Sequence, residues 1–319
     1  MKTPNSRQPP LNFMKYRTWY YLLSAVVILP GLILLFFGGF KPAIDFTGGS
    51  LLEIQLPPAF PLTDTQLAAY LPSTVTLAAV VHTQENTLVL RTSPLNKNQA
   101  DLFRYHLATA SAELVNATTT AQLAPMTEIR FETIGPTLGQ ELLQKTVVAL
   151  LLAGSAILAY IAYRFKNLKY GVSAILAMFH DSFVVISLFA LWGYFYGVEV
   201  DTLFVTALLT ILSFSVHDTI VVYDRIRESA KRFPSVPYVH LVNLALTETI
   251  GRSINNSLTI IFMLLSLLLF GGVTIRWFVM ALLIGTISGT YSSPFIAAPL
   301  LIEWDRLAAK LAHFKKRRR

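Results

Sequence analysis

Two ionisable residues, His217 and Asp218, lie inside a stretch that is otherwise apolar enough to cross a bilayer. The stretch runs from Leu203 to Tyr223, and a spanning helix needs roughly 20 such residues. An acid at the centre of a bilayer costs about 2.5–3.5 kcal/mol or more, and such residues usually line ion or proton paths. We therefore expect Asp218 to carry protons. His217 beside it is of a type that can titrate near neutral pH.

Arg252 is the expected partner of Asp218. It comes just before the apolar stretch Ile254–Phe270, which is predicted to run antiparallel to the helix of Asp218. Burial favours the protonated carboxyl, whereas an approaching guanidinium favours the charged form, so a change in their distance would load and release a proton. Two alternatives stay open: a static buried ion pair, and an Arg252 side chain that reaches lipid phosphates.

A second candidate site is the pair His180 and Asp181, about midway along the apolar stretch Gly171–Tyr196. Two polar groups at that depth are costly and usually face the interior of a helix bundle. A proton path and a packing role within the bundle explain the pair equally well.

Composition places the chain among integral membrane proteins. Of its 319 residues, 54% are hydrophobic and only 14% are charged, against about 25% charged in a typical soluble domain. The absence of cysteine excludes disulfides and thiol chemistry. The sequence shows no metal-binding cluster, no nucleophile arrangement and no phosphate-binding loop, so we predict neither an enzyme nor a cofactor.

Six transmembrane helices are predicted, with both termini in the cytoplasm. Basic residues gather at 1–18, after the second and fourth spans, and at 303–319, all on one side of the membrane, as the positive-inside rule requires. The net charge of +8 is therefore interpreted as a topology signal and not as a nucleic-acid site, although the basic tail could also contact anionic lipid or RNA. The fourth span is expected to end at Asp224, before a polar segment at 224–252. The predicted spans are 19–40, 142–163, 171–196, 203–223, 254–270 and 277–302.

Residues 41–141 are predicted to form a soluble domain outside the cytoplasm. Strand and helix patterns alternate in the order β-α-β-β-α-β, which is typical of a ferredoxin-like α+β fold. The expected elements are strands at 50–56, 74–82, 87–92 and 126–134, and helices at 63–71 and 96–114.

Four motifs in this order resemble the SecF-type members of the SecD/SecF protein-export family, which belongs to the resistance-nodulation-division superfamily. The first contains Asp45, Phe46, Thr47, Gly48 and Gly49, just after the first span. The second contains Gly135, Pro136, Gly139 and Glu141, just before the second span. The third runs from His217 through Asp224 and Arg225 to Glu228, and the fourth from Arg252 to Thr259. Two details depart from the family pattern: His217 stands where Asn is common, and Ser253 and Asn256 stand where Thr is common.

The resemblance implies a subunit of the Sec translocase that pairs with SecD and uses the proton-motive force to drive late, ATP-independent export through SecY-E-G. It implies that Asp218 lies on the proton path and that Arg252 is its functional partner. The implied contacts are SecD, SecY-E-G, translocating preproteins, membrane lipids and, as a further candidate, YajC, in the plasma (inner) membrane or a thylakoid. Two other functions remain open: half of a proton-coupled exporter of small molecules or lipids, and a purely structural scaffold.

Overall fold

A computed structural model describes residues 11–55, 76–82, 87–103, 105–106, 109, 127–165 and 167–317. The chain divides into two compact units. One comprises residues 1–41 with 148–319, and the other comprises residues 42–147. The first unit is helical and holds the candidate site, and the second contains a β-sheet.

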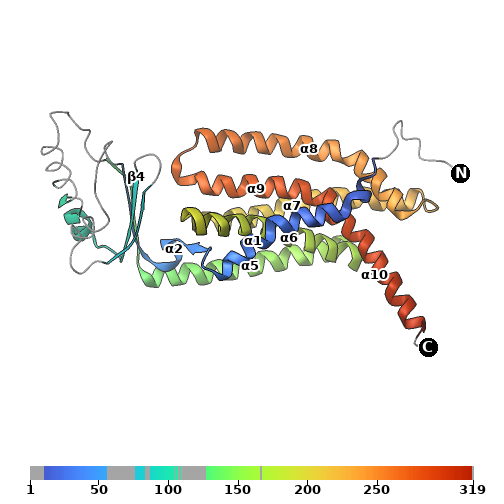
Figure 1. The fold of residues 1–319 in the computed structure, drawn as a ribbon, viewed down its shortest axis with the longest axis horizontal. Helices are drawn as coiled ribbons and strands as arrows, with labels where there is room; N and C mark the ends of the chain where they lie inside the picture. The colour runs from blue at the N-terminus through green and yellow to red at the C-terminus, as the bar shows by residue number, and fades with distance from the viewer. Residues whose placement is uncertain are drawn as a thin grey trace. The chain divides into compact units, whose positions relative to one another are not determined.

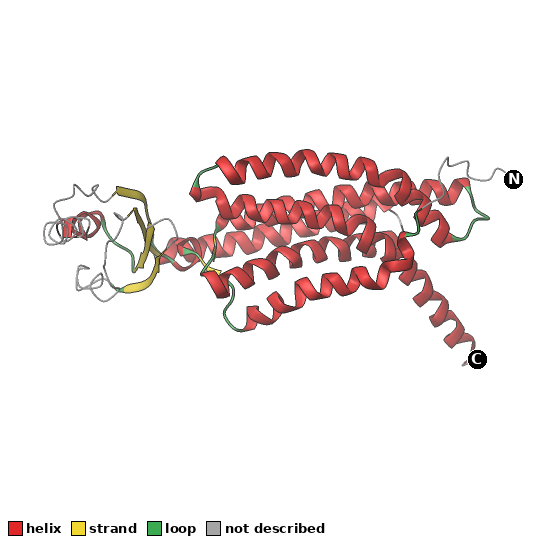
Figure 2. Ribbon diagram, turned by 45° about the horizontal axis from the view of Figure 1, so that its top comes forward, coloured by secondary structure: helices red, strands yellow, loops and turns green. Residues whose placement is uncertain are grey.

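Six helical segments of the described chain are long and apolar enough to span a membrane, which confirms the predicted number. Their order along the chain is shown in Figure 1, and Figure 2 shows that helices form nearly all of the first unit. The short 3-10 helix η1 (Phe13–Tyr16) precedes the first, and the sixth passes through a π-helical turn, η3 (Ser293–Ala297). The α-helical segments are α1 (Arg17–Phe36), α5 (Pro136–Phe165), α6 (Leu168–Tyr196), α7 (Thr202–Arg232), α8 (Tyr238–Phe270), α9 (Arg276–Ser292) and α10 (Ala298–Arg317).

Helices α7, α8 and α10 extend well beyond their predicted apolar spans. α7 continues past Tyr223 to Arg232, α8 starts at Tyr238 and not at Ile254, and α10 continues past Ile302 to Arg317. None of these extensions contains proline, and a helix satisfies its own backbone hydrogen bonds in water as well as in lipid. Hydropathy therefore marks where the chain leaves the membrane, but not where the helix ends.

The inner layer of the helical unit consists of α6, α7 and the last spanning helix. Half of the most apolar window is buried in α6 and in α7, and 61% in the last helix, against 11% in α1 and 6% in α5. A β-carbon on Gly31 of α1 would overlap the backbone of Ser187 in α6. Small residues let membrane helices approach closely, since lipid supplies little hydrophobic force between them.

The second unit contains a four-stranded antiparallel sheet in the order β3-β4-β2-β5. Alternate residues of β2 and β4, such as Leu52 and Leu90, are buried and pair across the two strands. The strands expected at 74–82 and 87–92 are present as β3 and β4, which pair antiparallel. Residues 97–103 are helical, whereas the expected helix at 63–71 lies outside the described residues, so the complete ferredoxin-like pattern stays a prediction. The strands are β2 (Gly49–Gln55), β3 (Leu77–His82), β4 (Thr87–Thr92) and β5 (Thr127–Ile134).

Candidate functional site

Asp218 lies in α7, and only one of its two carboxyl oxygens accepts a hydrogen bond. The residue is 7% exposed, and Ser253 of α8 donates a hydrogen bond to its Oδ1 at 2.6 Å. The other oxygen, Oδ2, is buried and forms no hydrogen bond of normal geometry among the described residues, although the Ser293 hydroxyl lies near the carboxyl group. A buried polar atom without a partner costs about 1–3 kcal/mol. A proton or an incoming cation would therefore be stabilised most at Oδ2.

Arg252 lies beside this site but does not contact Asp218. The adjacent residue, Ser253, makes that contact, so the two helices meet at the predicted level. Arg252 is exposed, and no described residue forms an ion pair with it. In this conformation of the single chain the two charged residues are therefore not the static buried ion pair that the sequence left open.

Two polar stripes face outward on α7 and α8 at the depth of the membrane. In each stripe the residues follow one another at helical spacing, so they share one face. Two of the α7 hydroxyls, those of Thr206 and Thr210, are bonded only to backbone carbonyls four residues earlier in their own helix. All eight residues are exposed: Thr206, Thr210, Ser213 and His217 on α7, and Arg252, Asn255, Asn256 and Thr259 on α8.

Asp181, the second acid predicted in the membrane core, is fully buried at 0% exposure. Its Oδ1 accepts a hydrogen bond from Ser288 at 2.6 Å and lies 3.0 Å from His180 Nδ1. Its Oδ2 accepts hydrogen bonds from Ser215 at 2.5 Å and from Ser292 at 2.6 Å. We call these five residues the Asp181 cluster. Unlike Asp218, Asp181 has partners at both oxygens.

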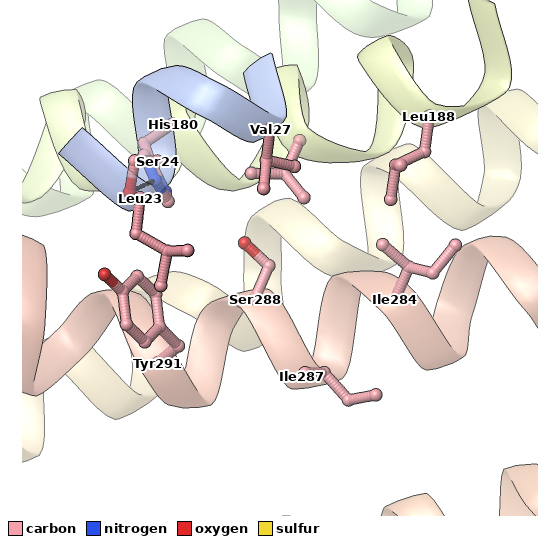
Figure 3. A pocket seen from close by; sticks show the side chains of 10 residues that line it. Leu23, Ser24, Val27, His180, Leu188, Ile284, Ile287, Ser288 and Tyr291 are labelled. Atoms are coloured by element: carbon pink, nitrogen blue, oxygen red, sulfur yellow. Dashed lines mark hydrogen bonds between the residues drawn. The ribbon is translucent and has the colours of Figure 1, made fainter. Parts of the chain in front are cut away.

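His180 links the Asp181 cluster to α1. Its Nε2 lies 2.8 Å from Ser24 Oγ, and its side chain is 11% exposed. Figure 3 shows this pair at one end of a cavity of about 310 Å³, with Ser288 and Tyr291 of α9 along the cavity. The remaining lining is apolar and comes from α1, α6 and α9: Leu23, Val27, Val184, Leu188, Ile284 and Ile287.

Sequence analysis missed the hydroxyl groups that hold the two acids. Ser288 and Ser292 are four residues apart, so both project from one face of the last spanning helix. That spacing was readable in the sequence, but nothing local linked it to Asp181, which is 107 residues from Ser288. Ser253 was noted only as a departure from a family pattern.

The two glycine motifs of the second unit pack against each other. Gly48 and Gly49 have φ of 72° and 132°, which side-chain-bearing residues rarely adopt. A β-carbon on Gly48 would lie 2.8 Å from Pro136 Cα, and one on Gly139 would lie 2.9 Å from Gly48 N. The motifs therefore form one close backbone contact where β2 begins. The other motif residues lie beside it: Asp45, Phe46 and Thr47 in the short helix α2 (Ile44–Thr47), and Glu141 in α5, paired with Lys145 at 2.7 Å.

Ion pairs tie together the ends of α5, α7 and α8. Asp224 pairs with Arg164 of α5 and, at 3.4 Å, with Arg227. Arg225 pairs with Glu248 of α8 at 2.6 Å and with Glu228 at 2.7 Å. Asp224 and Arg225 of the third motif therefore hold helix ends together and do not contact the buried acids.

Six spanning helices with two buried carboxyl groups define a polytopic membrane protein with ionisable residues in its core. Among such proteins, the chain belongs to the SecD/SecF family, and within it to the SecF type of protein translocase subunit. The family model "Protein export membrane protein SecD/SecF, C-terminal" matches residues 115–307, and the "SecD/SecF GG Motif" matches residues 33–56.

The sequences of similar proteins align with nearly the whole chain. A protein translocase subunit SecF of Thermobaculum terrenum is 39% identical, with 92% of this chain and 94% of the relative covered. One from a Synechocystis strain is 34% identical, with 93% and 95% covered. The crystal structure of SecDF, a translocon-associated membrane protein from Thermus thermophilus, superposes with a TM-score of 0.76 at 31% identity. That match covers 94% of this chain but only 39% of the SecDF chain.

Proposed function

We propose that this chain pairs with a SecD subunit and uses the proton-motive force to drive the late, ATP-independent stage of protein export through SecY-E-G. The observation that carries this function is the half-satisfied carboxyl of Asp218, buried within the membrane span. Ser253 holds Oδ1, which leaves Oδ2 available for a proton. Arg252, one residue before Ser253 on α8 and free of ion pairs to described residues, would compete with that proton if it turned inward.

The exposed polar stripes of α7 and α8 support a SecD partner. Polar groups that face lipid without partners are costly, so exposed stripes at this depth need a covering protein surface. The matched SecDF chain is more than twice as long as the part that this chain covers. A SecD helix bundle over α7 and α8 would enclose His217 and Arg252 and complete the site around Asp218.

The proton gradient provides enough free energy for a conformational step. One elementary charge that crosses 100 mV is worth about 2.3 kcal/mol. That amount favours one of two conformations by roughly fiftyfold at room temperature. A proton that binds Asp218 would remove the charge that attracts Arg252, and its release would restore that attraction.

The proposed orientation places both termini in the cytoplasm of a plasma (inner) membrane. Arg164, Lys169 and Arg225 lie at the helix ends on the proposed cytoplasmic side, whereas Glu199 and Asp201 lie between α6 and α7 on the other side. Residues 42–147 then lie outside the cytoplasm, where a ferredoxin-like domain could contact the moving preprotein. The proposed role is not enzymatic, because no covalent bond of the preprotein is made or broken in it.

The decisive experiment replaces Asp218 with Asn in vesicles that contain this chain, its SecD partner and SecY-E-G. The amide keeps the shape of the carboxyl group but cannot exchange a proton. We expect a proton gradient to accelerate the late export stage of the wild type and to have no effect on Asp218→Asn. The matched control is Asp305→Asn, which removes an acid whose side chain is 49% exposed and pairs with Lys169. This control should keep the gradient response.

An equal response of Asp218→Asn and the wild type would refute the proton role of Asp218. If gradient-driven release of a small molecule or lipid persisted without any preprotein, the exporter function would be favoured instead. If replacement of both Asp218 and Arg252 by apolar residues left export unchanged, the chain would be a scaffold.

A further inference from the structure

We propose that His180 and Asp181 form a second proton-binding site, which shares one proton between His180 Nδ1 and Asp181 Oδ1 and is coupled to Asp218. This site deepens the proton-driven function proposed above and rests on it. Its geometry is specific: Nδ1 and Oδ1 are 3.0 Å apart, Asp181 is 0% exposed, and both imidazole nitrogens have a polar partner.

Charge balance favours one proton on the pair. The three serine hydroxyls donate to Asp181 without changing its charge. A deprotonated aspartate beside a neutral histidine would leave one net negative charge in the membrane core, where charges are costly. One shared proton makes the pair neutral overall, either as imidazolium with carboxylate or as imidazole with carboxylic acid.

Among the described residues, no basic side chain forms a hydrogen bond or an ion pair with His180 or Asp181. Titratable groups on the packed helices include Tyr291 of α9, whose ring centroid lies 6.5 Å from that of His180, and, on α7, Asp218 with His217 beside it. Lys169 at the start of α6 pairs with Asp305 of α10 at 2.7 Å. Phenols are neutral at physiological pH, so Asp218 and the neighbouring His217 are the groups whose charge can change near the pair.

Two structural links join the pair to Asp218. On α7, Ser215 donates to Asp181 and lies three residues before Asp218, about one helical turn away. On the last spanning helix, Ser292 donates to Asp181, while the next residue, Ser293, bonds to Thr219 at 3.1 Å. Ser293 opens the π-helical turn η3, and such turns often occur at functional sites. A displacement of α7 at Asp218 would therefore disturb the donors of Asp181.

An open, largely apolar cavity borders the pair at His180. His180 forms part of its wall, and the cavity measures about 310 Å³ (Figure 3). A hydronium ion that enters would give its proton to the pair and leave as water, and the reverse step would return the proton. Because the lining is almost entirely apolar, water would enter only transiently, and exchange would be slow.

The first test measures the protonation of the pair in the complex of this chain with its SecD partner in lipid vesicles. Nitrogen-15 NMR reports imidazolium, and infrared spectroscopy reports a protonated carboxyl. The His180→Gln and Asp181→Asn variants assign the two signals. We expect one of these signals in the wild type, and we expect one of the two variants to lose it. Absence of both signals in the wild type would overturn the proposal.

The second test measures coupling. Asp218→Asn removes the nearby acid, and we expect it to shift the protonation signal of the pair. Asp305→Asn is the matched control and should leave that signal unchanged. If Asp181→Asn does not fold, Ser292→Ala serves in its place, because it removes one donor from Asp181 and should also shift the signal. An unchanged signal in both Asp218→Asn and Ser292→Ala would disprove the coupling.

These spectra separate the two proposals from each other. If the pair shows a protonation signal but Asp218→Asn retains gradient-driven export, the second proton site stands and the proton role of Asp218 falls. If Asp218→Asn abolishes the gradient response but the pair shows no protonation signal, the proposed function stands, and His180 and Asp181 are a structural hydrogen-bonded pair.

Discussion

At the level of single residues, the membrane core contains two aspartates that differ in how many of their carboxyl oxygens accept hydrogen bonds. Asp181 has partners at both oxygens, whereas Asp218 has one donor and an unpartnered oxygen. A fully satisfied buried network gives rigidity, and a partly satisfied group is usually a site of change. Oδ2 of Asp218 is therefore the oxygen that can gain a partner, whereas the serine donors fix the position of the Asp181 carboxyl group.

Ser253→Ala tests whether the single donor of Asp218 matters. Loss of that hydrogen bond would leave both oxygens unpartnered, so we expect the free energy of unfolding to fall by about 1–3 kcal/mol. Unfolding in detergent would measure the loss. Ser266→Ala on the same helix is the control, because the Ser266 hydroxyl is exposed and bonds only to the carbonyl of Phe262. Equal losses in both variants would contradict the prediction.

At the scale of elements, contacts between backbones position the helices and the sheet. Gly31 lets α1 lie directly on α6 in the helical unit, and Gly48 lets the start of β2 lie against Pro136 in the other unit. Both contacts join segments that are far apart in the sequence. A single β-carbon at either glycine would force the neighbouring backbone to move.

Gly48→Ala should destabilise the second unit by about 1–3 kcal/mol, since φ is 72° and Pro136 Cα lies 2.8 Å from the new β-carbon. Gly135→Ala in the partner motif is the control, because its β-carbon would meet nothing within 4 Å. Chemical unfolding, monitored by far-ultraviolet circular dichroism, would compare the stability of the two variants. The prediction fails if Gly135→Ala is as destabilised as Gly48→Ala.

Gly31→Ala tests the contact between α1 and α6. The added methyl group would overlap the backbone of Ser187, and such overpacking costs about 1–3 kcal/mol. Thermal unfolding in detergent should show a lower Tm for this variant. Gly154→Ala on α5 meets nothing within 4 Å and should keep the wild-type Tm. Indistinguishable melting curves would show that α1 can shift without cost.

At the scale of the whole molecule, the helical unit is incomplete on one side. The polar stripes of α7 and α8 are exposed, and both lie next to Asp218 in a chain whose other spans present apolar side chains to lipid. A surface of this kind fits a protein partner better than it fits hydrocarbon. The working unit in the membrane is therefore expected to be the chain together with its SecD partner.

Because the chain has no cysteine, one introduced cysteine can carry a spin label at a chosen position. A label at Thr210→Cys should be accessible to dissolved oxygen in the isolated chain and protected once SecD is present. A label at Leu152→Cys on α5, where the leucine is 66% exposed, should remain accessible in both samples. Paramagnetic relaxation by oxygen measures this accessibility. Unchanged accessibility at Thr210 would place the partner elsewhere.

The membrane class, the number of spans, the strands of the second unit and the two buried acids could all be predicted from the amino-acid sequence. These properties follow from local hydrophobicity, periodicity and charge, which act within a few residues. The helix extents beyond Tyr223 and before Ile254 were not determined in this way, because a helix can continue after the apolar signal has ended.

Only the tertiary structure decided which groups surround each acid. Ser253 and not Arg252 contacts Asp218, and serines of α7 and α9 hold Asp181. It also showed that His217 faces outward and that the two glycine motifs share one contact. These facts depend on the rotation of each helix about its axis and on contacts between distant segments. Rotation follows from packing against neighbours, and no local pattern encodes those neighbours.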